Sequence, residues 1–189
     1  NIGVYYSNGT ASGPVTNESE IELTGKNGVG IYAADGITLV NNSDITSTAG
    51  QSDSIASYIG GGSQLTSTGI ITMNDNDSIG IYVEEGKGIN SGTITMNGAA
   101  SASSKSVVGM IAKAVAGKTA TIENATRKEI KVGANLGMYI AGAGASSGRN
   151  TGSITATGTG TGVYIDGSGN SFDGTGGTIT SNAVGIYLK

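Results

Sequence analysis

The residues best suited to ligand binding are tyrosines that recur at nearly constant spacing. They share one position of a short phrase, as in Ile79-Gly80-Ile81-Tyr82, and are Tyr5, Tyr32, Tyr58, Tyr82, Tyr139, Tyr164 and Tyr187. A row of aromatic side chains on a surface can bind sugar rings or a partner protein. The favoured alternative is structural, because aromatic neighbours on adjacent strands contribute about 0.2–1 kcal/mol per pair. The candidate ligand-binding residues of this row are Tyr32, Tyr58, Tyr82, Tyr139 and Tyr164.

A second candidate site is an irregular insertion region, residues 99–132. It contains the two longest spacings between phrases, the one copy in which Ile111 replaces tyrosine, and six of the ten basic residues. A local basic patch could attract an anionic glycan or an acidic protein. The favoured alternative is a solvated loop whose lysines discourage strand pairing. The candidates for ligand binding here are Lys105, Lys113, Lys118, Arg127 and Lys128.

Whether the chain could hydrolyse glycosides depends on the spacing of its acidic residues. Glycoside hydrolysis uses two carboxylic acids about 5–10 Å apart. Asp35 and Glu85 follow tyrosine phrases two repeats apart, which is roughly 10 Å if the repeats stack as strands, although solvated strand ends explain them better. The sequence has no His and no Cys, which excludes a Ser-His-Asp triad, a thiolate nucleophile and the common zinc sites. We therefore predict no catalytic residue, no metal site and no cofactor.

Charge and hydropathy exclude two further classes of protein. The net charge of −4 gives no overall field that would attract nucleic acid. The longest mostly apolar stretch, residues 107–117, is interrupted by Lys113 and is shorter than the roughly 18 residues that a membrane-spanning helix needs. No signal-peptide pattern opens the chain. We expect neither a nucleic-acid partner nor a membrane-spanning helix.

The elements that must position these residues follow from the repeat. The tyrosine phrase occurs eight times, with its central residue 23 to 29 positions from the next. A second phrase, as in Gly92-Thr93-Ile94-Thr95, lies between copies, and a looser apolar phrase precedes it. Gly, Ser, Thr and Asn make up 93 of the 189 residues, while Ile and Val outnumber Leu by 32 to 5. Each repeat therefore predicts three short strands separated by turns, with Asn41, Asn42 and residues 74–76 as turn residues of a kind that tolerates left-handed backbone.

Alternation within the phrases predicts which side chains are buried. In the fourth copy Ile79, Ile81 and Val83 are expected to face inward, with Gly80 and Tyr82 outward, and in the sixth copy Leu136 is likewise expected inward. In the second phrase isoleucine is expected inward and threonine outward. Strands this short need stacked neighbours to be stable. We predict an all-β fold: a right-handed parallel β-helix with three strands per turn and about seven turns, roughly 34 Å long. A propeller needs four strands per blade, and a leucine-rich repeat needs more leucine.

Several phrases resemble the passenger repeats of bacterial autotransporter (type V secretion) proteins. They are Gly30-Ile31-Tyr32-Ala33, Gly80-Ile81-Tyr82-Val83 and Asn90-Ser91-Gly92-Thr93-Ile94-Thr95, and they are most similar to the fusobacterial outer-membrane adhesins with vacuolating-cytotoxin-like repeats. The resemblance implies a long extracellular β-helix at the cell surface, anchored in the outer membrane only by a C-terminal barrel that this sequence lacks. It also implies cell adhesion and virulence as the role, without enzymatic activity.

From this resemblance we expect residues 1–189 to be a single β-helix fragment of a longer passenger, and to be monomeric. The expected partner is a protein or glycan on host cells or other bacteria. The runner-up is a β-helical carbohydrate-active enzyme, with glycosidase-like or lyase-like activity, or a tailspike-type domain. A third interpretation is a spacer with no ligand.

Overall fold

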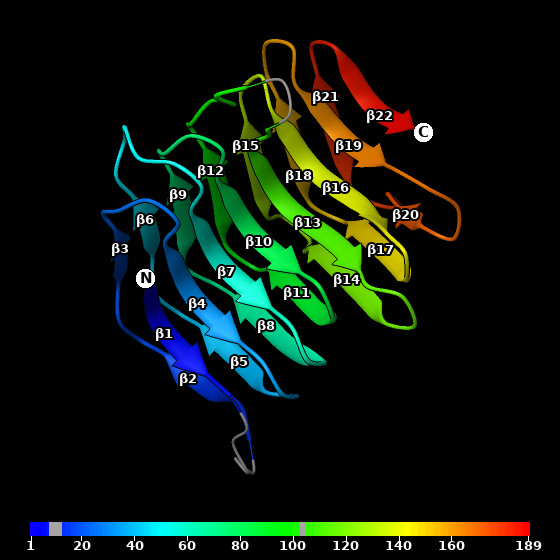
Figure 1. The fold of residues 1–189 in the computed structure, drawn as a ribbon. Helices are drawn as coiled ribbons and strands as arrows, with labels where there is room; N and C mark the ends of the chain where they lie inside the picture. Colours follow the sequence, from blue (N-terminus) through cyan, green and yellow to red (C-terminus); the bar gives the residue numbers. More distant parts are fainter. Residues whose placement is uncertain (8–12, 103–104) are drawn as a thin grey trace.

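The apolar phrases form short strands in the computed structural model, which describes residues 1–7, 13–102 and 105–189 (Figure 1). Within these residues the chain winds through three parallel sheets, and no helix interrupts them. Each turn adds one strand to each sheet. The predicted all-β parallel solenoid with three strands per turn and about seven turns is therefore confirmed.

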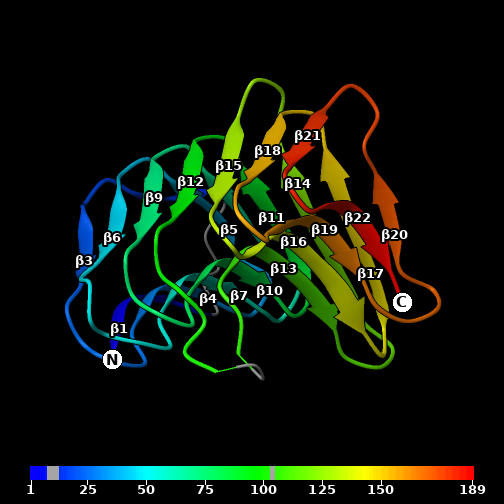
Figure 2. The same ribbon diagram turned by 90° about the horizontal axis from the view of Figure 1, so that it is seen from above.

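The strands of the three sheets follow one another in chain order. The first sheet contains β1 (Ile2–Tyr6), β4 (Val29–Ala33), β7 (Ile55–Ile59), β10 (Ile79–Val83), β13 (Val108–Ala114), β16 (Leu136–Gly142), β19 (Thr161–Ile165) and β22 (Val184–Leu188). The second contains β2 (Val15–Asn17), β5 (Thr38–Asn41), β8 (Ser63–Ser67), β11 (Gly86–Asn90), β14 (Thr119–Asn124), β17 (Ala145–Asn150) and β20 (Ser171–Asp173). The third contains β3 (Ile21–Leu23), β6 (Ile45–Ser47), β9 (Ile70–Met73), β12 (Thr93–Met96), β15 (Glu129–Val132), β18 (Ser153–Ala156) and β21 (Thr178–Ser181). Figure 2 shows the strands of the third sheet side by side.

The core lies between the three sheets and consists of columns of equivalent residues. Ile71, Ile94 and Ile130 of the third sheet pair directly with one another and are fully buried. The threonines beside them, such as Thr72 and Thr95, are half-exposed on the outer face. The predicted orientation of the second phrase is confirmed.

The predicted alternation fails at the glycine of the tyrosine phrase. Gly80 is buried and faces the interior, because a Cβ on it would lie 3.1 Å from Cγ2 of Ile94 and 2.5 Å from the carbonyl oxygen of Gly109. Ile79 and Leu136, expected inward, are half-exposed instead. Two consecutive residues therefore point inward in these strands, and the first of them has to be small because the isoleucine column of the third sheet occupies the space.

A buried column of asparagines joins the second sheet to the third. In register it reads Asn17, Asn41, Ser67, Asn90, Asn124 and Asn150. Nδ2 of Asn90 donates to Oδ1 of Asn124 at 2.8 Å, and Nδ2 of Asn124 donates to Oδ1 of Asn150 at 2.8 Å. The interpretation as turn residues is wrong for Asn41, which lies in β5, whereas Asn42 and residues 74–76 lie between strands; none of these residues has a positive φ. The left-handed positions outside glycine are Asn27, Asp35, Asp53, Asp77 and Arg127 among the described residues.

The insertion region is more regular than its spacing predicts. Three strands of ordinary register, β13, β14 and β15, lie inside residues 99–132. The extra length sits mainly in the connection between β12 and β13, residues 97–107, of which 103 and 104 lie outside the described residues. The irregularity is thus a longer connection attached to a continuous solenoid.

Substituting Asn124 with alanine should lower the free energy of unfolding by about 2–4 kcal/mol, because the amide of Asn90 and the oxygen of Asn150 then lose a buried partner. Thermal and urea unfolding measure the effect. The control Asn42→Ala, at an exposed asparagine, should change stability by less than about 0.5 kcal/mol. Equal effects at the two positions would contradict a stabilising role of the buried column.

Ser57 is a weak point of the core, since its buried hydroxyl has no partner among the described residues and lies between Ile31 and Ile81. Ser57→Ala should raise the free energy of unfolding by about 1 kcal/mol, because it removes a desolvated polar group. Ser47→Ala should lower it, since Oγ of Ser47 donates to Asp75 at 2.5 Å and accepts from the amide of Asn74 at 2.8 Å. Denaturant unfolding curves of the two variants test this explanation. A change in the free energy of unfolding in the same direction for both variants would contradict it.

Candidate binding face

The tyrosines lie on the outer face of the first sheet, in the predicted single column. The rings of Tyr5, Tyr32, Tyr58 and Tyr82 stack in sequence with centroid distances of 5.2, 4.8 and 5.4 Å. Their planes tilt by only 7–22° from one to the next. In-register parallel pairing produces this stack, since each tyrosine pairs with the tyrosine of the next turn.

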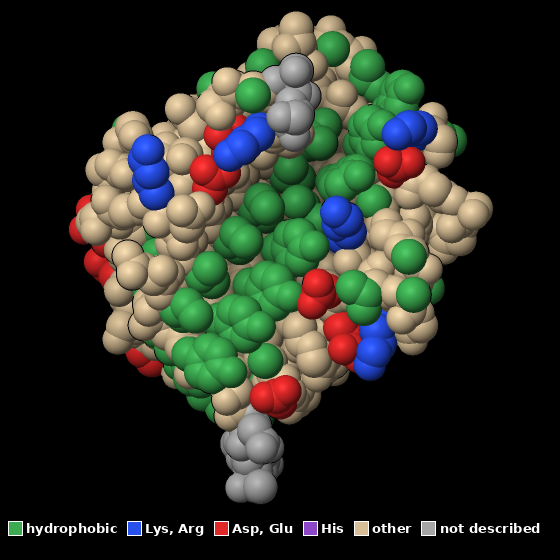
Figure 3. All heavy atoms as spheres, viewed as in Figure 1, with side chains coloured by type: hydrophobic (Ala, Val, Ile, Leu, Met, Phe, Trp, Pro, Cys, Tyr) green, Lys and Arg blue, Asp and Glu red, His purple; other side chains and the backbone are tan. Residues whose placement is uncertain are grey.

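A second outward column, which the sequence reasoning placed inside the core, runs beside the rings. It consists of Ile2, Val29, Ile55, Ile79, Val108, Leu136, Thr161 and Val184. We call the two columns together the tyrosine face. In Figure 3 it forms a continuous hydrophobic band along the first sheet. The glycine at this position in seven of the eight phrases, with Ala56 in the other, is the signal for it, because this small residue takes the inward place that alternation assigns to the aliphatic residues.

The column of tyrosine rings is interrupted in the fifth turn. Ile111 replaces the ring and pairs with Tyr82 and Tyr139. Beyond it the rings of Tyr139 and Tyr164 meet edge to face, 5.5 Å apart at 65°, and stacking resumes at Tyr187. The interruption therefore divides one aromatic ladder into two parts.

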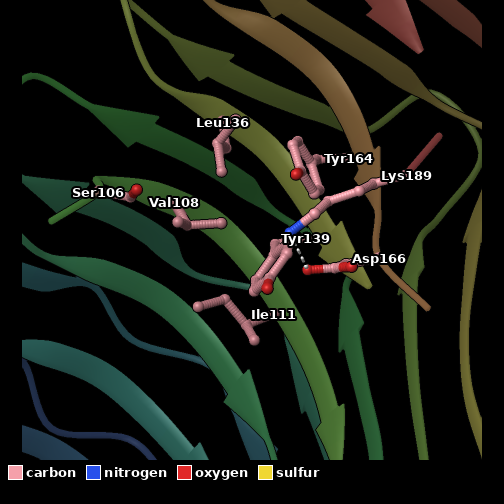
Figure 4. A pocket seen from close by; sticks show the side chains of 8 residues that line it. All are labelled: Ser106, Val108, Ile111, Leu136, Tyr139, Tyr164, Asp166 and Lys189. Carbon is pink, nitrogen blue, oxygen red and sulfur yellow. Dashed lines mark hydrogen bonds and ion pairs between the residues drawn. The ribbon is translucent and has the colours of Figure 1, made fainter. Parts of the chain in front are cut away.

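A recess of about 590 Å³ lies at this interruption (Figure 4). It is lined by Ser106, Val108, Ile111, Leu136, Tyr139, Tyr164, Asp166 and Lys189. Val108 is 2 % and Ile111 is 6 % exposed, so most of the accessible lining comes from the residues around them. Ser106 belongs to the long connection before β13, so the insertion forms one wall of the recess. At its rim Nζ of Lys189 lies 3.5 Å from the carboxylate of Asp166.

Burial and nearby carboxylates change the acidity of three tyrosines. The pKa of Tyr58 is raised by its burial and by Glu84, to whose carboxylate its hydroxyl donates at 2.6 Å. Burial and Glu84 also raise the pKa of Tyr82. Burial and Asp166 raise the pKa of Tyr139. These three phenols therefore stay neutral and able to donate hydrogen bonds throughout the physiological pH range.

The structure does not bring the five basic candidates into one patch. Lys105 forms ion pairs with Asp53 and Asp77 at the corner between the third and first sheets. Lys113 is exposed near the end of β13, and Lys118 lies in the next connection. Arg127 and Lys128 lie at the opposite corner, between β14 and β15. The chain turns a corner between successive strands, which separates residues that are close in sequence.

The carboxylates of the catalytic hypothesis have structural contacts. Glu85 pairs with Lys118 at 2.9 Å, and Asp35 occupies a left-handed turn position with φ 62° after β4. Among the described residues no group of three or more Asp and Glu side chains could hold a metal ion. Outside residues 8–12 and 103–104, no helix has the length and hydropathy to cross a membrane.

These features define a class, the three-sheet parallel β-solenoid, here with an exposed aromatic face. Within this class the chain belongs to the family of the BigA third pectate lyase-like domain, whose family model matches residues 3–127. This is a domain of bacterial surface proteins, so the prediction of a surface-protein β-helix is confirmed at that level. No curated protein and no solved structure matches the chain significantly.

The raised pKa of Tyr58 predicts a loss of stability at alkaline pH. The fold favours the neutral phenol, so its contribution is complete below the unfolded-state pKa of about 10 and is lost as the pH rises above it. Unfolding temperatures measured at increasing pH, together with a near-ultraviolet tyrosine titration, test this. The loss should be smaller in Tyr58→Phe, and Glu84→Gln should lower the pKa of Tyr58. A titration of all tyrosines near pH 10 would contradict the assignment.

Proposed function

We propose that this chain is a segment of the extracellular passenger of an autotransporter-type adhesin, of the kind represented by the fusobacterial outer-membrane adhesins. In this proposal it is displayed on the bacterial outer membrane and attaches the cell to a protein or glycan on host cells or other bacteria. Its contact surface is the tyrosine face. Membership of a surface-protein family supports the location.

The observation that carries the proposal is the length and continuity of the tyrosine face. Eight strands contribute to it, and no strand of the described residues lies over it (Figure 1). Tyr5 is 57 % and Tyr187 is 45 % exposed, while the tyrosines between them are half-exposed. Scattered apolar side chains are ordinary on protein surfaces, whereas a contiguous apolar band marks an interaction surface. Tyrosine is also among the residues that dominate binding energy at protein interfaces.

The solenoid supports this role by holding the rings rigidly. Each strand of the face is hydrogen-bonded on both sides, except at the two ends of the sheet. A side chain that is already ordered loses little conformational entropy when a partner binds. The tyrosines are therefore well suited to binding a ligand without rearrangement.

Replacing Tyr32 and Tyr58 together with threonine should weaken attachment of the purified chain to epithelial cells or to bacteria by about tenfold or more, since aromatic anchors carry much of an interface's energy. Threonine keeps the preference for strands. The matched control is Thr72→Ala with Thr95→Ala, two outward positions on the third sheet. Flow cytometry with fluorescently labelled protein measures binding, and circular dichroism checks that both variants fold.

Two other results would replace the proposal. Equal attachment by all variants, or none by the native chain, would favour a spacer. Release of new reducing ends from acidic or neutral polysaccharides, abolished in Asp35→Asn or Glu85→Gln, would favour a carbohydrate-active enzyme of lyase or glycosidase type.

A further inference from the structure

The interruption at Ile111 leaves aromatic ring surface uncovered. Inside the column Tyr32 and Tyr58 are each stacked between two other rings at 4.8–5.4 Å, so both of their faces are covered. Tyr82 and Tyr139 are two strand spacings apart, roughly 10 Å, with no ring between them. Tyr139, which lines the recess (Figure 4), therefore has a side that no other ring covers.

A second depression, of about 300 Å³, prolongs the recess. The two adjoin, because Ser106, Leu136 and Tyr164 line both of them. The second depression is also lined by Asn135, at the corner between the third and first sheets, and by Thr161 at the start of β19. The recess and the depression together form an elongated groove, which we call the corner groove. It lies beside the long connection before β13 and extends from the tyrosine face to the corner.

The corner groove offers many hydrogen-bonding groups. In the recess itself the accessible lining is more polar than apolar. The lining side chains with hydroxyl, amide or carboxylate groups are Ser106, Asn135, Tyr139, Thr159, Thr161, Tyr164 and Asp166. A ligand that covers these groups has to supply hydrogen-bond partners to several of them, since burial of unpaired polar groups is unfavourable. A purely apolar ligand does not meet this requirement.

One of these groups is held in place and still lacks a partner. Asn135 is 9 % exposed, and its Nδ2 donates to the carbonyl oxygen of Gly98 at 3.0 Å. Its Oδ1 accepts no hydrogen bond from any described residue and reaches solvent, and the side chain lines the corner groove. The oxygen is therefore a fixed acceptor for a donor group on a ligand.

The charges along the corner groove are already compensated. Asp166 pairs with Lys189 at 3.5 Å, and Lys105 pairs with Asp53 and Asp77. Among the described residues that line the groove, no charge is left to attract an ionic ligand. A charged ligand would have to displace one of these pairs. The lining therefore favours a neutral ligand that is rich in hydroxyl groups.

A sugar ring meets these requirements together. Its C–H groups on one face pack against an aromatic side chain, while its hydroxyls donate and accept hydrogen bonds around its edge. We propose that the corner groove binds a neutral oligosaccharide, with one ring against Tyr139, the hydroxyls of that ring bonded to Asp166, and a neighbouring ring donating to Oδ1 of Asn135. This inference rests on the proposed adhesin function and specifies that the ligand is a glycan.

An array of printed glycans tests the proposal. The whole chain of 189 residues is biotinylated at one terminus and carried on labelled streptavidin, because linked copies bind a surface more tightly than single ones. The array carries neutral oligosaccharides beside sialylated and sulfated forms of them. We expect binding to a subset of the neutral glycans, at least tenfold stronger than to their acidic forms. Binding to no glycan, equal binding to both sets, or binding to the acidic glycans alone would overturn the proposal.

A variant that fills the gap in the aromatic column locates the site. Ile111→Tyr introduces the residue found at this position in seven other turns, so it should fold, cover Tyr139 and reduce glycan binding by about tenfold or more. Its control, Thr66→Tyr, adds a ring on the outer face of the second sheet and should leave binding unchanged. Unaltered glycan binding by Ile111→Tyr would overturn the proposal.

The carboxylate in the recess provides an independent measurement. Asp166→Asn keeps the size of the side chain and removes a charged acceptor, so it should weaken glycan binding by about tenfold. The matched control is Asp173→Asn, because Asp173 also pairs with a basic residue but lies on the second sheet. Circular dichroism checks that all four variants fold. Equal effects at the two aspartates would place the glycan elsewhere and overturn the proposal.

These measurements are independent of the attachment assay. If the array shows no glycan binding while the chain still attaches to cells through Tyr32 and Tyr58, the proposal for the corner groove is overturned and the adhesin function stands. If attachment does not depend on these tyrosines, the adhesin function through the tyrosine face fails, whatever the array shows.

Discussion

In-register parallel pairing between successive turns is the constraint on which the rest of the structure depends. It places equivalent residues one strand spacing apart. Residues at the same position of successive repeats therefore form a ladder of like side chains. Isoleucine ladders fill the core, and asparagine amides connect one turn to the next at a corner. On the second sheet Glu123, Arg149 and Asp173 are in register and alternate in charge, with ion pairs at 3.8 and 3.4 Å. One geometric rule thus organises apolar, polar and charged groups alike.

The repeat made the architecture predictable from sequence, because a fixed period implies stacked units whose shared face is buried. The orientation of Tyr82, Ile94 and Thr95 also followed from local alternation. Alternation is a property of one strand, however, and Gly80 breaks it because a different sheet occupies the neighbouring space. In the same way Gly88, rather than Ile89, pairs with the buried Leu65, and side chains of the first sheet fill the volume that it leaves.

Only part of the candidate site was predictable from the sequence. The rest depends on how the strands are arranged in three dimensions, which residue types alone do not show. The tyrosine column could be read directly from the period. Its aliphatic neighbours were assigned to the core, since they are apolar and alternate correctly with Tyr82. The basic residues of the insertion region appeared clustered in sequence, but each strand is followed by a corner that carries the next residues to another side of the solenoid. The sequence predicts Asn41 to be a turn residue because a single sequence does not show that its hydrogen-bond partner lies 24 residues earlier at Asn17.

The parallel ladders also determine how the molecule responds to force. Hydrogen bonds between turns run along the solenoid axis, and each turn bonds only to its two neighbours. Tension applied along that axis acts on all the interfaces in series, so the turns should separate one interface at a time, with the weakest interface first. Tension applied across the axis acts on the strands of all three sheets at the same time. A rod of this design should yield gradually when pulled lengthwise and resist sideways shear.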